Sequence, residues 1–422
     1  MSSNSPVGIG ITQALSLATL HMRPLLPNIE NLSWDYGLSS IEVERSMLHF
    51  IPLFLTPKLI TLSFTLANVS DTISLSVLSG LVNFCPALKN LNFSIHDGNF
   101  TEEHQRLISS TICQWKGLQS VRVTDLTQEA LEHLATIPSL QTLSFNSLSS
   151  ATRTYDERLS ITIRNRAFGY PALQSLSISC RTMEMAIAFA QLLSSSPIEE
   201  LGIRVKDRCY PPAWRELFRT ISRHLNGTSL KRLVLEETGD ILGDWALQSV
   251  HFEIELDALT VFSNVQVVHV QPSFGIPLTS DTVNRLAIAW PHIEDLELGT
   301  GCPPSKTIIT PRDLIPFARY CPNLQSLGIV FDARSVHLRS LNPDGGPFSN
   351  NLTSLSVGDS PIDDPNLVAA FLSSIFPTIS SITANCEDEI ADEMWTEAEQ
   401  MLDIFDGEEH QENLQEFFRF IR

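Results

Sequence analysis

The stretch Trp290-Pro291-His292-Ile293-Glu294-Asp295-Leu296-Glu297-Leu298 decides how the chain is organised. Its pattern returns at Cys321-Pro322-Asn323-Leu324-Gln325-Ser326-Leu327-Gly328-Ile329. Apolar residues spaced by three and then by two predict a short β-strand, with Leu296 and Leu298 on one face. Asp295 and Glu297 then occupy the other face. The sequence therefore predicts an array of repeats.

The same frame of three apolar positions fits thirteen places along the chain. Their last two apolar residues, which mark the strands, are Leu32-Trp34, Leu62-Phe64, Leu91-Phe93, Val121-Val123, Leu143-Phe145, Leu176-Ile178, Leu201-Ile203, Leu233-Leu235, Val268-Val270, Leu296-Leu298, Leu327-Ile329, Leu355-Val357 and Ile382-Ala384. The mean spacing of roughly 29 residues lies within the range of leucine-rich repeats, which pair one strand with one helix. We predict an α/β leucine-rich-repeat solenoid of about 13 irregular repeats, with a curved parallel sheet on the concave side and helices on the convex side.

Helical patterns precede the strands. Apolar residues at i, i+3, i+4 and i+7, the spacing of a buried helix face, occur at Val283, Leu286, Ala287 and Trp290, and again at Leu314, Phe317, Ala318 and Cys321. Thr310-Pro311 and Asp364-Pro365 each place a capping oxygen before a proline at the first helical position. Helix, proline-containing turn and strand therefore form the predicted unit.

The chain of 422 residues is longer than a single hydrophobic core usually supports, so we expect growth in one dimension. We predict an N-terminal segment at residues 1–25, the solenoid at residues 26–386 and an acidic helical C-terminal cap at residues 387–422. Thirteen acidic residues and two arginines lie between Glu387 and Arg422, so this tail carries more than half of the net charge of −20.

The predicted C-terminal cap has two amphipathic helices. The first has a stripe of Ile390, Met394, Ala398, Met401, Leu402 and Phe405, and the second has Leu414, Phe417, Phe418 and Ile421. A solenoid needs an element that covers its last repeat and is polar outside, which these helices supply. The alternative is an acidic tail that docks a basic partner.

Composition indicates a folded protein that does not bind nucleic acid. Hydrophobic residues make up 43% and charged residues 18%, and the net negative charge opposes binding to a phosphate backbone. The seven cysteines lack a Cys-x-x-Cys pair and predict reduced thiols, with Cys85, Cys180 and Cys321 packed as small hydrophobes. The chain also shows no leader peptide and no membrane-spanning stretch, so we expect a cytoplasmic or nuclear location and no membrane partner.

The sequence indicates no catalytic chemistry. It has neither a His-Glu-x-x-His nor a Gly-x-Ser-x-Gly motif, and the loop at Gly299–Lys306 has two prolines where a phosphate loop needs N–H donors. Asp295 beside Glu297 is interpreted as surface charge. We therefore expect a protein without catalytic residues, metal ligands or cofactor, and not an enzyme.

The residues that face outward from the strands predict a binding surface for a protein substrate or a peptide. In the first half of the chain these residues are small and neutral, such as Thr61, Ser63, Asn90, Asn92, Ser120, Thr142, Ser144, Ser175 and Ser177. Charge begins in the middle of the chain. We predict that the partner contacts Glu200, Arg204, Arg232, Glu236, Asp295 and Glu297, because a few placed charges discriminate between partners better than area does. Ordinary solvated strand faces are the alternative.

Four longer excursions interrupt the repeats, at residues 146–169, 205–214, 236–263 and 331–347. Such loops at one rim of a solenoid are candidate binding elements, because they vary without disturbing the core. The alternative, which the low cost of long insertions favours, is that they are tolerated surface insertions.

Several segments resemble the repeats of a known family. The Trp290-Pro291 and Cys321-Pro322 turns, together with Pro272–Leu278, Pro316–Leu324 and Ser360–Pro365, are similar to the carboxy-terminal repeats of the F-box/leucine-rich-repeat proteins of mushroom-forming fungi. The resemblance implies that the repeats select the substrate of a Skp–cullin–F-box ubiquitin ligase. An amino-terminal F-box would hold the ligase adaptor.

The sequence departs from that family at its start. An F-box is a set of helices about fifty residues long, and only about 25 residues precede the first repeat frame at Ile29. We therefore expect no F-box within residues 1–25. The other functions in view are a repeat scaffold independent of any ligase and a secreted or surface recognition protein.

Overall fold

The computed structural model describes residues 24–34, 51–66, 80–95, 102–146, 169–239, 255–301, 309–336, 351–386 and 388–405. The chain divides into two compact units. The N-terminal unit comprises Met1–Cys180 with Ser195–Pro197, and the C-terminal unit comprises Arg181–Ser194 with Ile198–Arg422.

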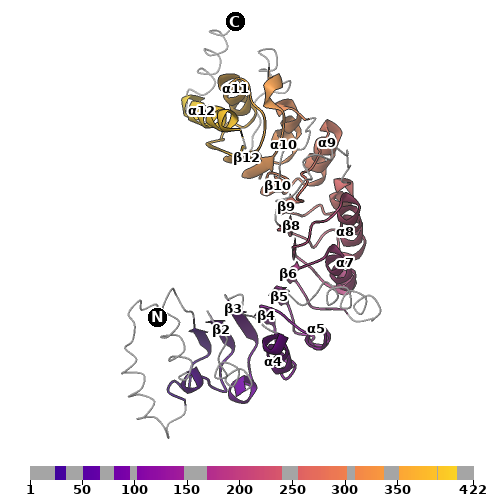
Figure 1. Ribbon diagram of the computed structural model, residues 1–422, viewed down its shortest axis with the longest axis vertical. Helices are drawn as coiled ribbons and strands as arrows, with labels where there is room; N and C mark the ends of the chain where they lie inside the picture. The colour runs from indigo at the N-terminus through magenta and orange to yellow at the C-terminus, as the bar shows by residue number, and fades with distance from the viewer. Residues whose placement is uncertain are drawn as a thin grey trace. The chain divides into compact units, whose positions relative to one another are not determined.

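The described part of the N-terminal unit contains six parallel strands that pair in sequence order. They are β1 (Asn31–Trp34), β2 (Thr61–Leu66), β3 (Asn90–Ile95), β4 (Ser120–Val123), β5 (Thr142–Asn146) and β6 (Ser175–Cys180). Among the described residues of this unit, the helical elements include η1 (Ile51–Leu53), α4 (Glu102–Ile112) and α5 (Gln128–Ala135), and residues 80–84 are also helical. Helices α4 and α5 lie against one face of the strands (Figure 1).

The described part of the C-terminal unit contains seven parallel strands, again paired in sequence order. They are β7 (Glu200–Val205), β8 (Arg232–Glu237), β9 (Val267–Gln271), β10 (Asp295–Leu298), β11 (Ser326–Ile329), β12 (Ser354–Gly358) and β13 (Ser381–Ala384). The longer helices are α7 (Met183–Leu192), α8 (Pro211–His224), α9 (Ser280–Ala289), α10 (Ile315–Tyr320), α11 (Pro365–Ile375) and α12 (Glu389–Phe405). Short 3-10 helices are η2 (Leu193–Ser195), η4 (Leu256–Val261), η5 (Pro311–Leu314) and η6 (Ala333–Ser335).

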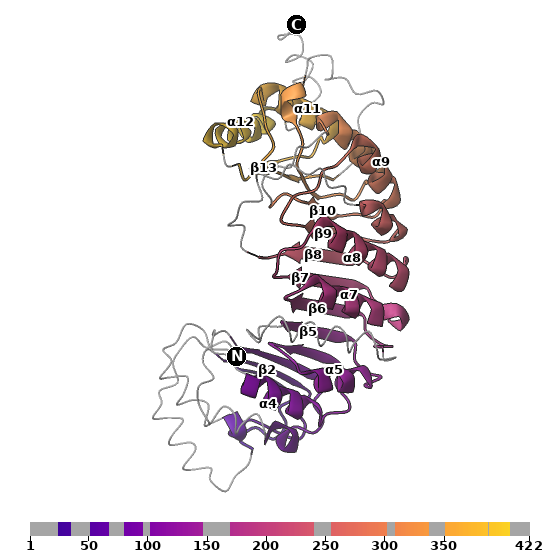
Figure 2. The same ribbon diagram turned by 45° about the vertical axis from the view of Figure 1, so that its right-hand side comes forward.

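Helices α7 to α11 follow one face of the strands of the C-terminal unit (Figure 2). In each unit, the open face is the strand face turned away from the helices. All thirteen strand positions predicted from the repeat frame are confirmed. The predicted class, an α/β leucine-rich-repeat solenoid of about thirteen irregular repeats, is therefore confirmed.

The repeat leucines form the core because the strands pair in one common register. Leu296 on β10 pairs with Val268 on β9 and with Leu327 on β11. All three side chains have 0% exposure. Each buried position is thus shared by neighbouring repeats, which is how a solenoid stabilises a chain too long for one core.

The turns between helix and strand are buried as the sequence predicts. Trp290 is 1% exposed, and the Cys321 thiol at the corresponding position lies 3.6 Å from the Trp290 carbonyl oxygen. Burial raises the pKa of Cys321 to about 12, so its thiol is an inert core group. Cys85 and Cys180 are also buried, as predicted, and none of the cysteines within the described residues forms a disulfide.

Both predicted helix starts are present. The Asp364 carboxylate accepts hydrogen bonds from the backbone N–H groups of Asn366 and Leu367, each at 3.1 Å, and so caps α11. Thr310 precedes η5, and its backbone N–H donates to Asp313 at 2.7 Å, as in a capping box.

Helix α12 packs against α11 and β13, at the end of the described repeats. Its buried stripe is Trp395, Ala398 and Leu402, whereas Ile390 is 63% exposed. The prediction that Ile390 lies on the buried stripe is therefore wrong, because the packed face is centred on Trp395. The second predicted helix of the cap, at residues 414–421, lies outside the described residues, and the division at residues 25/26 and 386/387 stays a prediction.

Candidate functional site

Strand register places the six predicted contact residues on the open face of the C-terminal unit. Glu200 on β7 pairs with Arg232 on β8. Four residues further along the same strands, Arg204 pairs with Glu236. On β10, Asp295 and Glu297 alternate with the buried Leu296. The repeat frame predicted these orientations, because successive strand residues face opposite ways.

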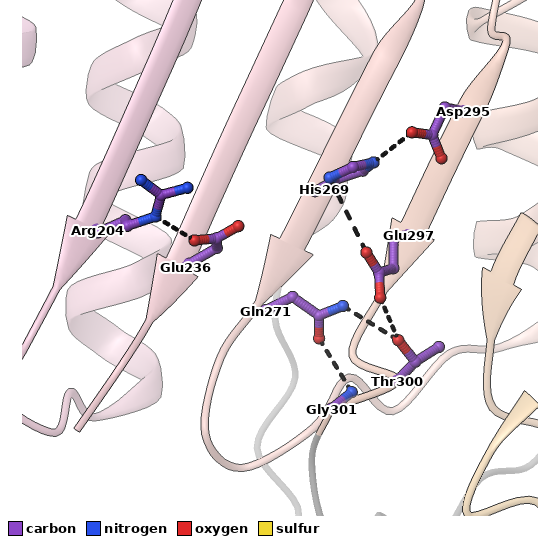
Figure 3. Close-up of polar contacts among 8 residues, drawn as sticks. All are labelled: Arg204, Glu236, His269, Gln271, Asp295, Glu297, Thr300 and Gly301. Atoms are coloured by element: carbon purple, nitrogen blue, oxygen red, sulfur yellow. Dashed lines mark hydrogen bonds and ion pairs between the residues drawn. The ribbon is translucent and has the colours of Figure 1, made fainter. Parts of the chain in front are cut away.

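Arg204 and Glu236 form a cross-strand ion pair. The Arg204 Nε atom lies 2.5 Å from a Glu236 carboxylate oxygen (Figure 3). The Arg204 side chain is 52% exposed and the Glu236 side chain is 26% exposed, so water screens the pair. A pair of this kind contributes about 0–1 kcal/mol to folding, which leaves it available for recognition.

His269 on β9 lies between the two carboxylates of β10, and it was not among the residues predicted from the sequence. The His269 Nε2 atom is 2.8 Å from Asp295 Oδ2, and the Nδ1 atom is 3.9 Å from Glu297 Oε2 (Figure 3). The side chain of His269 is 18% exposed, against 37% for each carboxylate side chain. Asp295 and Glu297 are therefore not the isolated surface charges that the sequence suggested.

Glu297 is also held from its other side. Thr300 donates from its hydroxyl to Glu297 Oε1 at 2.7 Å, and Gln271 donates from its amide to the Thr300 hydroxyl at 3.1 Å. The Gln271 amide oxygen in turn accepts from the backbone N–H of Gly301 at 3.3 Å (Figure 3). These contacts fix the carboxylate by a chain of hydrogen bonds that crosses from β9 to the end of β10.

The neighbouring strand leaves room for this arrangement. Gly328 on β11 pairs in register with Glu297, and a Cβ atom at Gly328 would lie 2.7 Å from the Glu297 Cγ atom. A separation below 3 Å is a steric clash, so a larger residue at this position would displace the glutamate. The glycine therefore lets Glu297 lie flat over β11.

The electrostatics of this cluster favour a charged histidine. The hydrogen bond to Asp295 raises the pKa of His269, and the charges of Asp295 and Glu297 act in the same direction. Burial and the charge of Arg232 oppose this rise. The hydrogen bond from His269 lowers the pKa of Asp295. The polar cluster of this face consists of Arg204, Glu236, His269, Gln271, Asp295, Glu297 and Thr300.

The open face of the N-terminal unit is mostly neutral, as predicted, and its amides and hydroxyls bond across strands. Asn90 donates from its amide to the Thr61 hydroxyl at 3.1 Å, and Asn92 donates to Ser63 at 3.1 Å. Arg122 on β4 interrupts this neutral face and was missed from the sequence. The repeat frame could have placed Arg122 on this face, since it occupies the same strand position as the outward residue Asn92 on β3, with which it pairs.

His269 and Gln271 also had a signal in the sequence. They alternate with the strand residues Val268 and Val270, so the repeat frame places them on the open face beside Asp295 and Glu297. Thr300 lies beyond the end of β10, where the repeat frame does not predict which way a side chain points.

Several predicted loops lie outside the described residues. The parts that are not described are residues 147–168, 240–254 and 337–347 of the predicted excursions and residues 302–306 of the loop at Gly299–Lys306. Of the four predicted excursions, residues 205–214 are described throughout, and they join β7 to the start of α8. Among the residues that the structure describes, no group of three or more His, Cys, Asp or Glu side chains is placed to hold a metal ion.

Comparison with known proteins finds similarity among solved structures. No protein-family model matches the chain, and no curated protein matches it. Among solved structures, the chain is similar to one described as "Crystal structure of Rad7 and Elc1 complex in yeast", with 16% sequence identity and a TM-score of 0.43 over 82% of each chain. In the part of the chain that the structure describes, no helix is both long and apolar enough to cross a membrane. The fold assignment rests on the strand order and register, which define a leucine-rich-repeat protein.

Proposed function

We propose that this leucine-rich-repeat chain is a non-enzymatic module that binds another protein or a peptide through the open face of its C-terminal unit. The predicted contacts are Glu200, Arg204, Arg232, Glu236, Asp295 and Glu297, to which His269 and Gln271 are added. No cofactor is required for this role.

One observation carries the proposal. Charged and polar side chains from four adjacent strands, β7 to β10, lie at matching register positions on one solvent-accessible face. Their backbones are fixed by a continuous core on the opposite face, so the charges are presented in a set pattern. A preorganised pattern of opposite charges selects between partners while adding little to fold stability.

The finer assignment, substrate selection for a Skp–cullin–F-box ubiquitin ligase, rests on the resemblance of the repeat turns to fungal F-box/leucine-rich-repeat proteins. Copurification of the ligase adaptor with the full-length gene product would support it. Binding of a partner in the absence of the adaptor would favour a scaffold that acts independently of the ligase. A leader sequence in the full-length gene product would favour a secreted or surface recognition protein.

A charge swap within one ion pair tests the binding face. We expect Arg204→Glu to remove the partner recovered with the wild-type chain by affinity purification and mass spectrometry. Adding Glu236→Arg restores an ion pair within the chain, so thermal unfolding should return to the wild-type value. Partner recovery should not return, because the swapped pair shows the partner an inverted pattern.

The matched control is the neighbouring pair of Lys231 and Glu199, which lies just before the same two strands with an N–O distance of 2.7 Å. The Lys231 side chain is 53% exposed, which is close to the 52% of Arg204, and the Glu199 side chain is 43% exposed, against 26% for Glu236. The swap Lys231→Glu with Glu199→Lys should leave recovery unchanged. Full recovery of the partner by the Arg204→Glu, Glu236→Arg chain would exclude this face as the binding site.

A further inference from the structure

The open face of the N-terminal unit carries an exposed cation in a neutral surrounding. Arg122 occupies the outward position in the middle of β4, between Asn92 on β3 and Ser144 on β5. It is exposed, and it makes no ion pair or hydrogen bond with any residue that the structure describes. An arginine in this state can donate to an external acceptor through a planar fork of N–H groups.

The side chains around Arg122 add donors and no competing charge. Ser120, Thr142 and Ser144 lie on the same face, and within the described residues their hydroxyls form no hydrogen bond. Asn92 is already oriented by its hydrogen bond to Ser63. A ligand at Arg122 would therefore meet free hydroxyl donors on β4 and β5 and a fixed amide on β3.

The charge of the N-terminal unit is compatible with an anionic ligand. Residues 1–180 contain thirteen acidic and eleven basic residues, so this unit is close to neutral, whereas the whole chain has a net charge of −20. The remaining residues, 181–422, therefore hold nearly all of the excess negative charge. An acidic segment would be repelled by the C-terminal unit and would bind more readily at the N-terminal one.

We propose that the open face of β3, β4 and β5 is a second interaction surface, which binds an acidic segment of a partner protein by pairing one of its carboxylates with Arg122. Arginine and carboxylate match in geometry, because two parallel N–H groups can donate to the two oxygens. Ser120, Thr142 and Ser144 would donate to the same carboxylate or to the backbone beside it. The proposal does not depend on the polar cluster, which belongs to the other unit.

Immobilised peptide pools that differ only at a central residue test this site. We expect the wild-type chain to be retained about fivefold better by a pool with central Glu than by the same pool with central Gln, since an exposed ion pair is worth a factor of that order. Arg122→Gln should abolish the preference. Lys116→Gln, an exposed cation in the turn before the same strand, should keep it.

The variants are first compared by thermal unfolding, and Arg122→Gln should match the wild type because its side chain is exposed. Equal retention on both pools, or a preference that survives Arg122→Gln, would overturn the proposal. Preferential retention on a pool with central phosphoserine would overturn the choice of a carboxylate as occupant. The Arg204→Glu, Glu236→Arg chain should keep the preference for the pool with central Glu, even if it loses the partner that binds the C-terminal unit.

Discussion

His269 binds the carboxylate diagonal to it in preference to its register partner. On neighbouring strands, His269 pairs with Glu297, yet its Nε2 atom lies 2.8 Å from Asp295, two positions back along β10. The Glu297 carboxylate stays 3.9 Å from the other ring nitrogen and is held by Thr300. One imidazole ring therefore faces a carboxylate from each of its two nitrogens.

This geometry predicts a pH-dependent contribution to stability. The pKa of His269 is raised in the folded chain, so the stabilisation by its imidazolium is complete below the usual histidine pKa of about 6.5 and is lost as the pH rises through the raised value. We expect His269→Gln to lower the free energy of unfolding by about 1 kcal/mol near pH 6 and by less at pH 9. Urea denaturation across this pH range measures the difference.

His292→Gln is the matched control, because His292 is exposed in the turn before β10, the strand that carries Asp295 and Glu297. Its effect on the free energy of unfolding should be small at every pH. A His269→Gln penalty that grows with pH would contradict an imidazolium held between two carboxylates.

Two adjacent glutamates at the end of β8 should differ sharply in their contribution to stability. Glu237 accepts hydrogen bonds from the buried indole N–H of Trp214, from the Cys209 backbone and from both donors of Ser273, at 2.7–3.3 Å. Glu237→Ala leaves these donors without an acceptor and should cost about 2–4 kcal/mol. Glu236→Ala removes only a solvated ion pair and should cost less than about 1 kcal/mol. Equal denaturation midpoints for the two variants would exclude a structural role for Glu237.

The strands and their buried faces could be predicted from the sequence, because both depend on local periodicity. The spacing that includes Leu296 and Leu327 located the strands and their buried faces, because each repeat uses the same frame and contacts its neighbours in register. The surroundings of Asp295 and Glu297 were not predicted, since the partner of Asp295 depends on the side-chain conformation of His269 and the position of Glu297 depends on the space left by Gly328. Glu237 was missed for a similar reason, because its donors come from two other segments of the chain, residues 209–214 and Ser273.

Truncation of a buried strand leucine should lower the free energy of unfolding far more than truncation of a hydroxyl side chain on the open face. Leu296→Ala and Leu327→Ala each remove a fully buried side chain shared by adjacent repeats, so each should cost about 2–5 kcal/mol. Ser177→Ala, on the open face of β6, should change the free energy of unfolding by less than about 0.5 kcal/mol. Guanidinium denaturation of the three variants compares them directly, and similar midpoints would mean that the strand faces are assigned in reverse.

Helix α12 offers the sharpest test of how the last repeats are covered. Trp395 is 1% exposed, its ring meets Phe331 edge-on with centroids 5.8 Å apart, and its indole N–H donates to the Ser360 carbonyl oxygen at 2.8 Å. Trp395→Ala should therefore cost about 3–5 kcal/mol. Ile390→Ala, on the exposed side of the same helix, should cost less than about 0.5 kcal/mol, provided that α12 acts as a cover for the core. If α12 is instead a docking tail, both variants should unfold at the wild-type temperature, and Trp395→Ala should change only the recovery of a partner.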